Sequence, residues 1–175
     1  RLWDATDGTP IGQPIMYNKK IRGTVFNKDK TRILTWTVDG TARLWDVTDG
    51  LPIGQPMLHD DIIVNAVFNK DETRILTWSG DVSNDRRGGT ARLWDAKDGS
   101  PIGLHMAHGE LISRAVFSKN ETRILTWSDD GTTRLWDAED GLPIGQPMKH
   151  NSKVKGAVFN NDETHILTWS DDGTA

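Results

Sequence analysis

The sequence contains no cysteine and no apolar run long enough to cross a bilayer. The lack of cysteine excludes disulfides and thiolate metal sites, and it fits a reducing compartment. The lack of a long apolar run or a signal-peptide pattern excludes a membrane-spanning segment by these criteria. We therefore expect a soluble, cytoplasmic chain with no membrane partner.

An excess of either charge sign is also missing. The 21 basic and 25 acidic residues give a net charge of −4, and the two signs are interleaved along the chain. A protein that tracks nucleic-acid phosphates needs a basic stripe, which this pattern does not provide. We expect no nucleic-acid partner.

What the sequence does contain is a fourfold repeat. The tetrapeptide RLWD begins at Arg1, Arg43, Arg92 and Arg134, with spacings of 42, 49 and 42 residues. A further copy would begin at position 176. The chain is therefore one array of four units, and the second unit carries a seven-residue insertion.

Each unit contains four segments with the composition of short β-strands. The run 153–160 alternates, 165–170 is apolar and aromatic, and an Asp-Gly hairpin signal separates it from the RLWD segment. The fourth segment, PIGQPM, has two prolines, which cannot donate to a ladder, so we expect it at the sheet edge. No segment has the helical period, and the fold class is therefore all-β.

Four antiparallel strands ending in Trp-Asp and repeated at about 40 to 45 residues resemble the WD40 repeat of β-propellers, over the whole chain. The near-identity of the units is similar to the recently amplified WD40 arrays found in bacteria. The resemblance implies a β-propeller of four-stranded antiparallel blades. Strand a is VKGAVFN, strand b THILTWS, strand c TARLWD and strand d PIGQPM.

These strands divide the chain into a single propeller domain, 1–175, with half a blade at each end. The parts are an N-terminal half-blade with strands c and d (1–15), blade 1 (17–58), blade 2 (59–107, with a b–c loop insertion at 80–89), blade 3 (108–149) and a C-terminal half-blade with strands a and b (150–175).

The resemblance also implies a buried hydrogen-bonded tetrad in each blade: His before strand a, Thr in strand b, Asp in the b–c turn and Trp in strand c. A buried indole, hydroxyl and imidazole each need a partner, and this chain of groups supplies one. Blade 3 matches in full, with His108, Thr126, Asp130 and Trp136.

The other blades match in part. The residues at the tetrad places are Tyr17, Thr35, Asp39 and Trp45 in blade 1; His59, Thr77 and Trp94 in blade 2, with Asp81 or Asp85 left open as the aspartate; and His150, Thr168 and Asp172 in the C-terminal half-blade, with Trp3 from the other end of the chain.

Strand b departs from the family pattern, which usually has a small residue between two hydroxyl residues. Here the residue is Trp36, Trp78, Trp127 or Trp169. We expect these four side chains to pack against the neighbouring blade and to set the blade spacing; the alternative is a binding role.

No enzymatic constellation is present. His105 lies near His108 in sequence, but two histidines without a matched carboxylate or cysteine are a weak metal signal. The chain has no P-loop, dinucleotide fingerprint or nucleophile elbow. We therefore expect no catalytic residue, no cofactor and no metal, and the chain is predicted not to be an enzyme.

The two half-blades each leave a strand edge and an apolar face uncovered, so the ring must close. Closure within one chain gives four blades at about 90° each, and closure between two chains gives eight at about 45°. A head-to-tail contact that closes yields a finite ring, which favours the homodimer. Other oligomeric rings, and a nine- or ten-bladed ring with surplus repeats, remain open.

The insertion in blade 2 is the individual feature of the array. Family geometry places it on the loop face that usually binds partners, and its Asp81, Asp85, Arg86 and Arg87 are candidate partner-binding residues. The alternative is a tolerated, solvated insertion.

The sequence thus predicts a non-enzymatic scaffold that self-assembles and presents a loop face to a protein or peptide partner. One alternative is a small-molecule or glycan-binding propeller. Because the chain starts and stops inside a hairpin, another is an excised or engineered piece of a longer repeat array.

Overall fold

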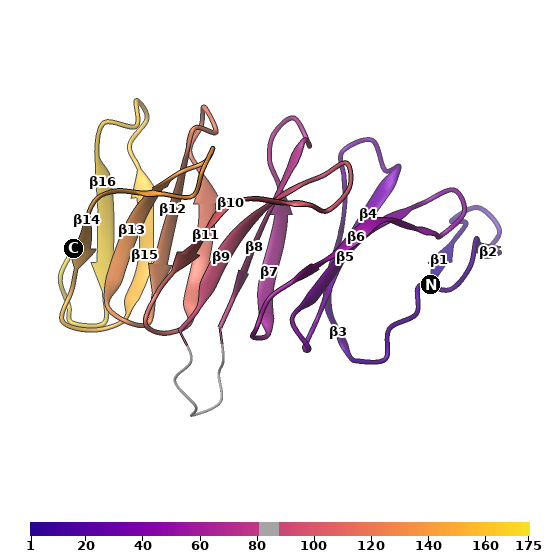
Figure 1. Cartoon of the computed structure of the whole chain (residues 1–175), viewed down its shortest axis with the longest axis horizontal. Helices are drawn as coiled ribbons and strands as arrows, with labels where there is room; N and C mark the ends of the chain where they lie inside the picture. Colours follow the sequence, from indigo (N-terminus) through magenta and orange to yellow (C-terminus); the bar gives the residue numbers. More distant parts are fainter. Residues whose placement is uncertain (81–87) are drawn as a thin grey trace.

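Three four-stranded antiparallel sheets and two two-stranded sheets follow one another along the chain (Figure 1). This is a computed structural model, and it describes residues 1–80 and 88–175. Those residues form strands, turns and bends and contain no helix. The prediction of an all-β propeller-type repeat fold is confirmed.

Each four-stranded sheet is one complete blade. Within a blade the strands pair in chain order, a to b to c to d. Their bounds are β3 (Ile21–Phe26), β4 (Arg32–Thr37), β5 (Thr41–Asp46) and β6 (Pro52–Leu58) in blade 1; β7 (Ile63–Phe68), β8 (Arg74–Ser79), β9 (Thr90–Asp95) and β10 (Pro101–Ala107) in blade 2; and β11 (Ile112–Phe117), β12 (Arg123–Ser128), β13 (Thr132–Asp137) and β14 (Pro143–Lys149) in blade 3.

The two-stranded sheets are the half-blades. β1 (Leu2–Trp3) pairs with β2 (Pro10–Ile11), and β15 (Val154–Phe159) pairs with β16 (Ile166–Ser170). The register of β1 repeats that of a complete blade, because Trp3 faces Pro10 as Trp45 faces Pro52. The N-terminal half-blade is thus already built as strands c and d.

A tight Asp-Gly turn joins strands b and c of blade 1. Gly40 follows Asp39 between β4 and β5 with a φ of 81°, a left-handed conformation that glycine adopts without strain. A Cβ at Gly40 would lie 2.4 Å from the carbonyl oxygen of His59. The close approach of the segment that leads into strand a of blade 2 therefore also requires glycine at this position.

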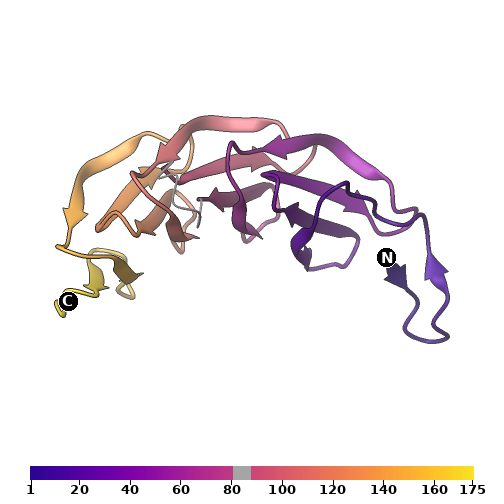
Figure 2. The same cartoon turned by 90° about the horizontal axis from the view of Figure 1, so that it is seen from below.

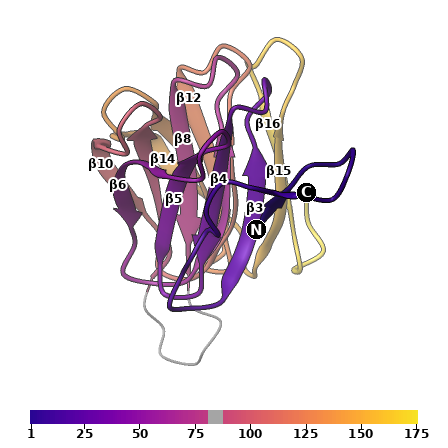
Figure 3. The same cartoon turned by 90° about the vertical axis from the view of Figure 1, so that its right-hand side faces the viewer.

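The blades succeed one another along an arc whose two ends stay apart (Figure 2). Seen along the long axis, β6 and β10 lie at one side of the stack and β3 and β15 at the other (Figure 3). The proline-containing strand d is the outer strand of each sheet, as the sequence predicts.

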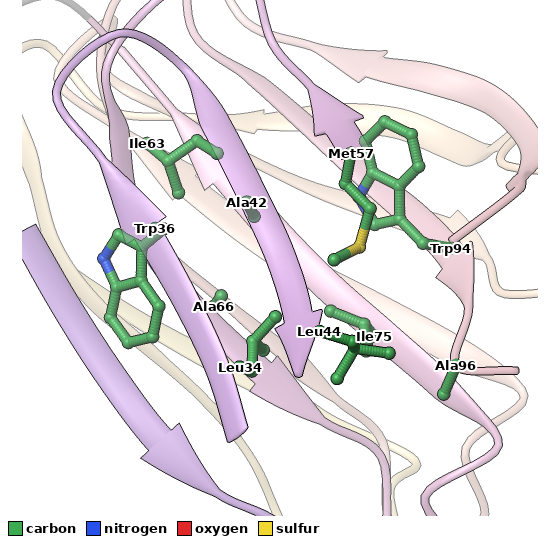
Figure 4. Packing of buried hydrophobic residues seen from close by; sticks show 10 residues of the cluster. All are labelled: Leu34, Trp36, Ala42, Leu44, Met57, Ile63, Ala66, Ile75, Trp94 and Ala96. Carbon is green, nitrogen blue, oxygen red and sulfur yellow. The ribbon is translucent and has the colours of Figure 1, made fainter. Parts of the chain in front are cut away.

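The hydrophobic core lies between blades. In the cluster of Figure 4, Leu34 and Trp36 of β4 pack with Ile63 and Ala66 of β7 in the next blade. Trp78 and Trp127 belong to equivalent clusters with the next strand a. The expected packing of these tryptophans against a neighbouring blade is confirmed for the three that have one.

We expect Leu76→Ala to lower the free energy of unfolding by about 2 to 5 kcal/mol, because it opens a cavity in a close-packed site. Leu76 is 0% exposed in the middle of the array. Urea unfolding would measure the change, with Leu51→Ala as the control, since Leu51 is 55% exposed. Equal losses in both variants would contradict a core located between blades.

Candidate assembly interface

Blade 3 brings all four of its tetrad residues together. The Trp136 indole donates to Thr126 Oγ1 (2.8 Å), which lies 2.7 Å from His108 Nε2. His108 Nδ1 lies 3.2 Å from Asp130 Oδ2. Since an ionised carboxylate can only accept, Nδ1–H donates to Asp130, and Nε2 of the neutral ring then accepts from the Thr126 hydroxyl, which in turn accepts from the indole.

The Asp130 carboxylate is stabilised in its charged form. Burial alone would raise its pKa, but hydrogen bonds from His108, from Thr132 and from the Gly109 N–H outweigh burial and hold that pKa well below its usual value. The last two bonds measure 2.6 and 2.8 Å. The carboxylate therefore joins the tetrad to both the b–c turn and the start of strand a.

In blade 1 a tyrosine phenol takes the place of the histidine as the partner of the corresponding threonine, Thr35. Tyr17 Oη lies 2.7 Å from Thr35 Oγ1, which accepts from the Trp45 indole at 2.8 Å. Asp39 does not reach Tyr17; it accepts from the Thr41 N–H at 3.2 Å and from the Thr37 hydroxyl. The structure therefore brings three of the four predicted residues together.

Blade 2 uses hydroxyls around its histidine. His59 Nε2 lies 2.6 Å from Thr77 Oγ1, and His59 Nδ1 lies 3.0 Å from both Ser79 and Thr90. The Trp94 indole donates to Thr77 at 2.7 Å. Burial, with smaller contributions from nearby cations, lowers the pKa of His59 to about 3. Asp81 and Asp85 lie outside the described residues.

The C-terminal half-blade contains the histidine, threonine and aspartate of a tetrad but not its tryptophan. His150 Nε2 lies 2.8 Å from Thr168 Oγ1, and His150 Nδ1 lies 3.0 Å from Thr174 and 3.5 Å from Asp172. Trp3 lies on β1 at the opposite end of the arc and is 53% exposed (Figure 1). Its counterparts Trp45, Trp94 and Trp136 are only 6, 3 and 4% exposed.

The edge of β16 is an uncovered interior surface. Leu167 is 55% exposed and Trp169 39% exposed, although the same two places in the three complete blades are at most 7% exposed. Within the described residues, β16 pairs only with β15. This edge therefore lacks both the strand c and the next blade that its counterparts contact.

The N-terminal end of the arc is uncovered in the same way. Ile21 is 41% exposed and Phe26 is 42% exposed, whereas Ile63 and Ile112, the counterparts of Ile21, are both 0% exposed. A shallow groove runs there, lined by Leu2, Ile15, Ile21, Phe26 and Ile33 among others. Both ends thus present apolar surface that the internal blades bury.

A backbone contact on the outer rim joins successive blades, and sequence reasoning did not find it. A strand-d N–H donates to an aspartate carbonyl in the next c–d turn: Gln13 to Asp49 (3.2 Å), Gln55 to Asp98 (2.8 Å) and Leu104 to Asp140 (2.7 Å). The Ile-Gly step before each donor was the available signal, because glycine is required where backbones approach this closely.

The rim contact also has two ends without a partner. Within the described residues, the Gln146 N–H and the Asp7 carbonyl have no hydrogen-bond partner of this kind. A Cβ at Gly54 would lie 2.1 Å from the Asp98 oxygen, but one at Gly145 would meet nothing within 4 Å. The two ends of the arc are therefore complementary on the rim as well.

The other candidate residues form no site. His105 Nδ1 lies 3.1 Å from Arg92 Nη2. Among the residues that the structure describes, no group of three or more His, Cys, Asp or Glu side chains could hold a metal ion. Arg86 and Arg87 of the insertion, like its two aspartates, lie outside those residues.

The comparisons support the fold. A family model described as WD40 (WD domain, G-beta repeat) matches residues 99–137, from the end of blade 2 through strand c of blade 3. This confirms the WD40 resemblance in that stretch. The comparison with curated proteins returned no match. No helix in the described parts of the chain has the length and apolarity needed to cross a membrane.

Two solved structures are similar over almost the whole chain. The computationally designed Ika4 protein matches with a TM-score of 0.72 and 21% identity, over 95% of each chain. The computationally designed Ika8 protein matches with a TM-score of 0.74 and 21% identity, over 98% of this chain and 49% of its own. This chain therefore spans about half the length of Ika8.

We expect Thr126→Val to destabilise the chain by about 2 to 4 kcal/mol, because it leaves a buried indole N–H and a buried imidazole without their partner. Thr126→Ser keeps the hydroxyl and should cost only about 1 kcal/mol. Thermal or urea unfolding of both variants would measure this. Equal losses for valine and serine would show that the hydroxyl is unimportant.

The lowered pKa of His59 predicts a loss of stability in acid. Between its usual value of 6.5 and the folded value of about 3, the unfolded chain binds a proton at this residue that the folded chain does not. Stability should therefore fall as the pH drops below about 6.5, by about 2 kcal/mol from pH 7 to pH 5.

His59→Tyr is the matched variant, because Tyr17 fills the same place in blade 1. It should lose this part of the pH dependence, which urea unfolding at pH 7 and pH 5 would measure. An unchanged difference between the two pH values would show that another group causes the loss.

Proposed function

We propose that this chain is a non-enzymatic WD40-type scaffold that self-assembles: two copies join through their half-blades into an eight-bladed ring. The observation that carries the proposal is the position of Trp3. It is the tetrad tryptophan of a blade whose histidine and threonine, His150 and Thr168, lie at the opposite end of the arc. A second copy placed head to tail would bring them together.

The strand pairing for this contact is already defined by the complete blades. In blade 1, Ile33 faces Trp45 and Leu34 faces Leu44. The same register between copies places Ile166 opposite Trp3 and Leu167 opposite Leu2. Burial of such side chains contributes about 1.5 to 3 kcal/mol each, and each ring contains the junction twice.

The outer rim supports the same arrangement. The Gln146 N–H of one copy would donate to the Asp7 carbonyl of the other, repeating the three rim bonds within the chain. The open space at Gly145 is where the Asp7 turn would fit, as the Asp98 turn fits against Gly54.

The arc favours two copies over closure within one. Its ends stay apart in this structure (Figure 2), and β1 does not pair with β16. A heterologous contact repeated by rotation forms a closed ring where the rotation closes, and an open filament where it does not. The match to Ika8, of which this chain covers 49%, shows that the same fold also occurs in a chain about twice as long.

Three parts of the function stay predictions. Binding of a protein or peptide on the loop face rests on insertion residues that lie outside the described part of the chain. The absence of catalysis rests on the lack of a polar cluster in the sequence. The cytoplasmic location rests on composition alone.

Light scattering after size exclusion tests the assembly. We expect a mass of twice the 19.5 kDa of one chain. Trp3→Ala should shift the mass to one chain, because it removes the indole that fills the half-blade and the donor to Thr168.

Leu104→Ala is the control, since Leu104 is 60% exposed on the outer strand and its backbone bond is kept. It should retain the two-chain mass. A one-chain mass for the unaltered protein at micromolar concentration would refute the dimer, and a mass of three or more chains would point to a larger ring.

A further inference from the structure

An ion pair joins blade 3 to the C-terminal half-blade. Lys153 Nζ binds Asp129 Oδ2 across the junction. Asp129 is the residue directly after strand b of blade 3, and Lys153 is the residue directly before strand a of the C-terminal half-blade. Within any one blade, the N–H of the residue after strand b donates to the carbonyl of the residue before strand a. Asp129 donates to Leu111 in this way, and Asp171 donates to Lys153, both at 3.0 Å.

The other internal junctions have no such pair. The corresponding residues are Val38 with Ile62 between blades 1 and 2, and Gly80 with Leu111 between blades 2 and 3. The charged residues return at the two open ends. Asp171 fills the acidic place on the C-terminal half-blade, where it binds Lys155 Nζ of the same half-blade at 2.9 Å, and Lys20 fills the basic place on blade 1.

A second polar contact joins neighbouring a–b turns, and it uses a carboxylate. Glu72 accepts the Lys28 N–H of blade 1, and it also accepts from Asn27 Nδ2 at 3.2 Å. Glu121 and Glu163 repeat this contact on the Lys70 and Lys119 N–H groups of the preceding blades. All three glutamates have a φ near 60°.

The open ends depart from this pattern together. Lys30 stands at the glutamate place of blade 1 with the same backbone, at a φ of 63°. On the C-terminal half-blade, Asn161 replaces the lysine and His165 replaces an arginine. In a two-chain ring, Lys30 of one copy would lie against the 160–165 turn of the other. That turn has Asn161 where the internal turns have a lysine, so no lysine would face Lys30.

The two turns consequently carry opposite charge. The 27–32 turn has three cations, Lys28, Lys30 and Arg32, against the single carboxylate of Asp29. The 160–165 turn has two carboxylates, Asp162 and Glu163, and neither lysine nor arginine. Of the two corresponding internal turns, 69–74 has two charges of each sign, and 118–123 has two cations and one carboxylate.

We infer that the two copies recognise each other by a charge pattern that no internal junction has in full: Lys20 of one copy pairs with Asp171 of the other, as Lys153 pairs with Asp129 at one internal junction, and Lys30 lies against the acidic 160–165 turn of the other, where the internal junctions have a glutamate. This inference rests on the two-chain ring proposed above. Complementary charge at a rim sets partner choice and register more than it sets affinity.

Two variants, each altered on one side only, provide the test. The first, Lys20→Glu, makes the N-terminal side more acidic and leaves Lys30 in place, because a glutamate there would repeat the internal contact that Glu72 makes with the Lys28 N–H. The second, Asp171→Lys, makes the C-terminal side more basic. Each variant alone places like charges at both junctions of its ring, and we expect its dimer dissociation constant to rise roughly tenfold or more at low salt.

Mixing the two variants should restore the dimer. One junction of the mixed ring then joins the two altered sides, which attract, and the other joins two unaltered sides. Mass photometry of an equimolar mixture should show two-chain particles that neither variant forms alone at that concentration. Because rescue requires both variants to be folded, it also excludes misfolding as the cause of the weakening.

Lys97→Glu is the control, since it makes the same change in net charge as Lys20→Glu at an exposed site in blade 2, away from both ends. It should leave dissociation unchanged. Two-chain particles that all variants form equally well, or a mixture without rescue, would overturn the charge assignment and leave the ring standing. A one-chain mass for the unaltered protein would overturn the ring itself, and the charge assignment with it.

Discussion

The structure depends on one constraint: strand b of each blade is buried on both faces, so a blade needs a neighbour on each side. Leu76 and Trp78 of β8 are at most 2% exposed because blades stand before and after them. This is why the clusters lie between sheets and why the chain forms an arc. The residues at the equivalent positions of β16, Leu167 and Trp169, are exposed because the next blade is missing there.

Within that arrangement, a threonine hydroxyl organises the polar interior of each blade. It accepts from an indole in all three complete blades, and the residue on its other side varies between Tyr17, His59 and His108. The outer partner of the histidine varies as well, from the hydroxyls around His59 to the carboxylate of Asp130. The inner bond is therefore constant, and the outer ones adapt to the local turn.

Much of the fold could be predicted from local signals. Asp-Gly pairs marked the hairpins, and the prolines of PIGQPM marked the outer strand, because both act through backbone chemistry within a few residues. The contacts between blades were not predictable in that way. The role of Glu72 on the Lys28 N–H, for example, depends on residues 44 positions apart and on a left-handed glutamate that its sequence neighbours do not indicate.

The rim contact involves only backbone atoms. Leu104 donates to the next turn as Gln55 does, so the contact does not depend on which side chain the donor carries. A repeat inserted, deleted or exchanged as a whole would find the same link on either side. Coupling of this kind lets the number of units in an array change without compensating substitutions at the rim, provided that each unit keeps the glycine before its donor.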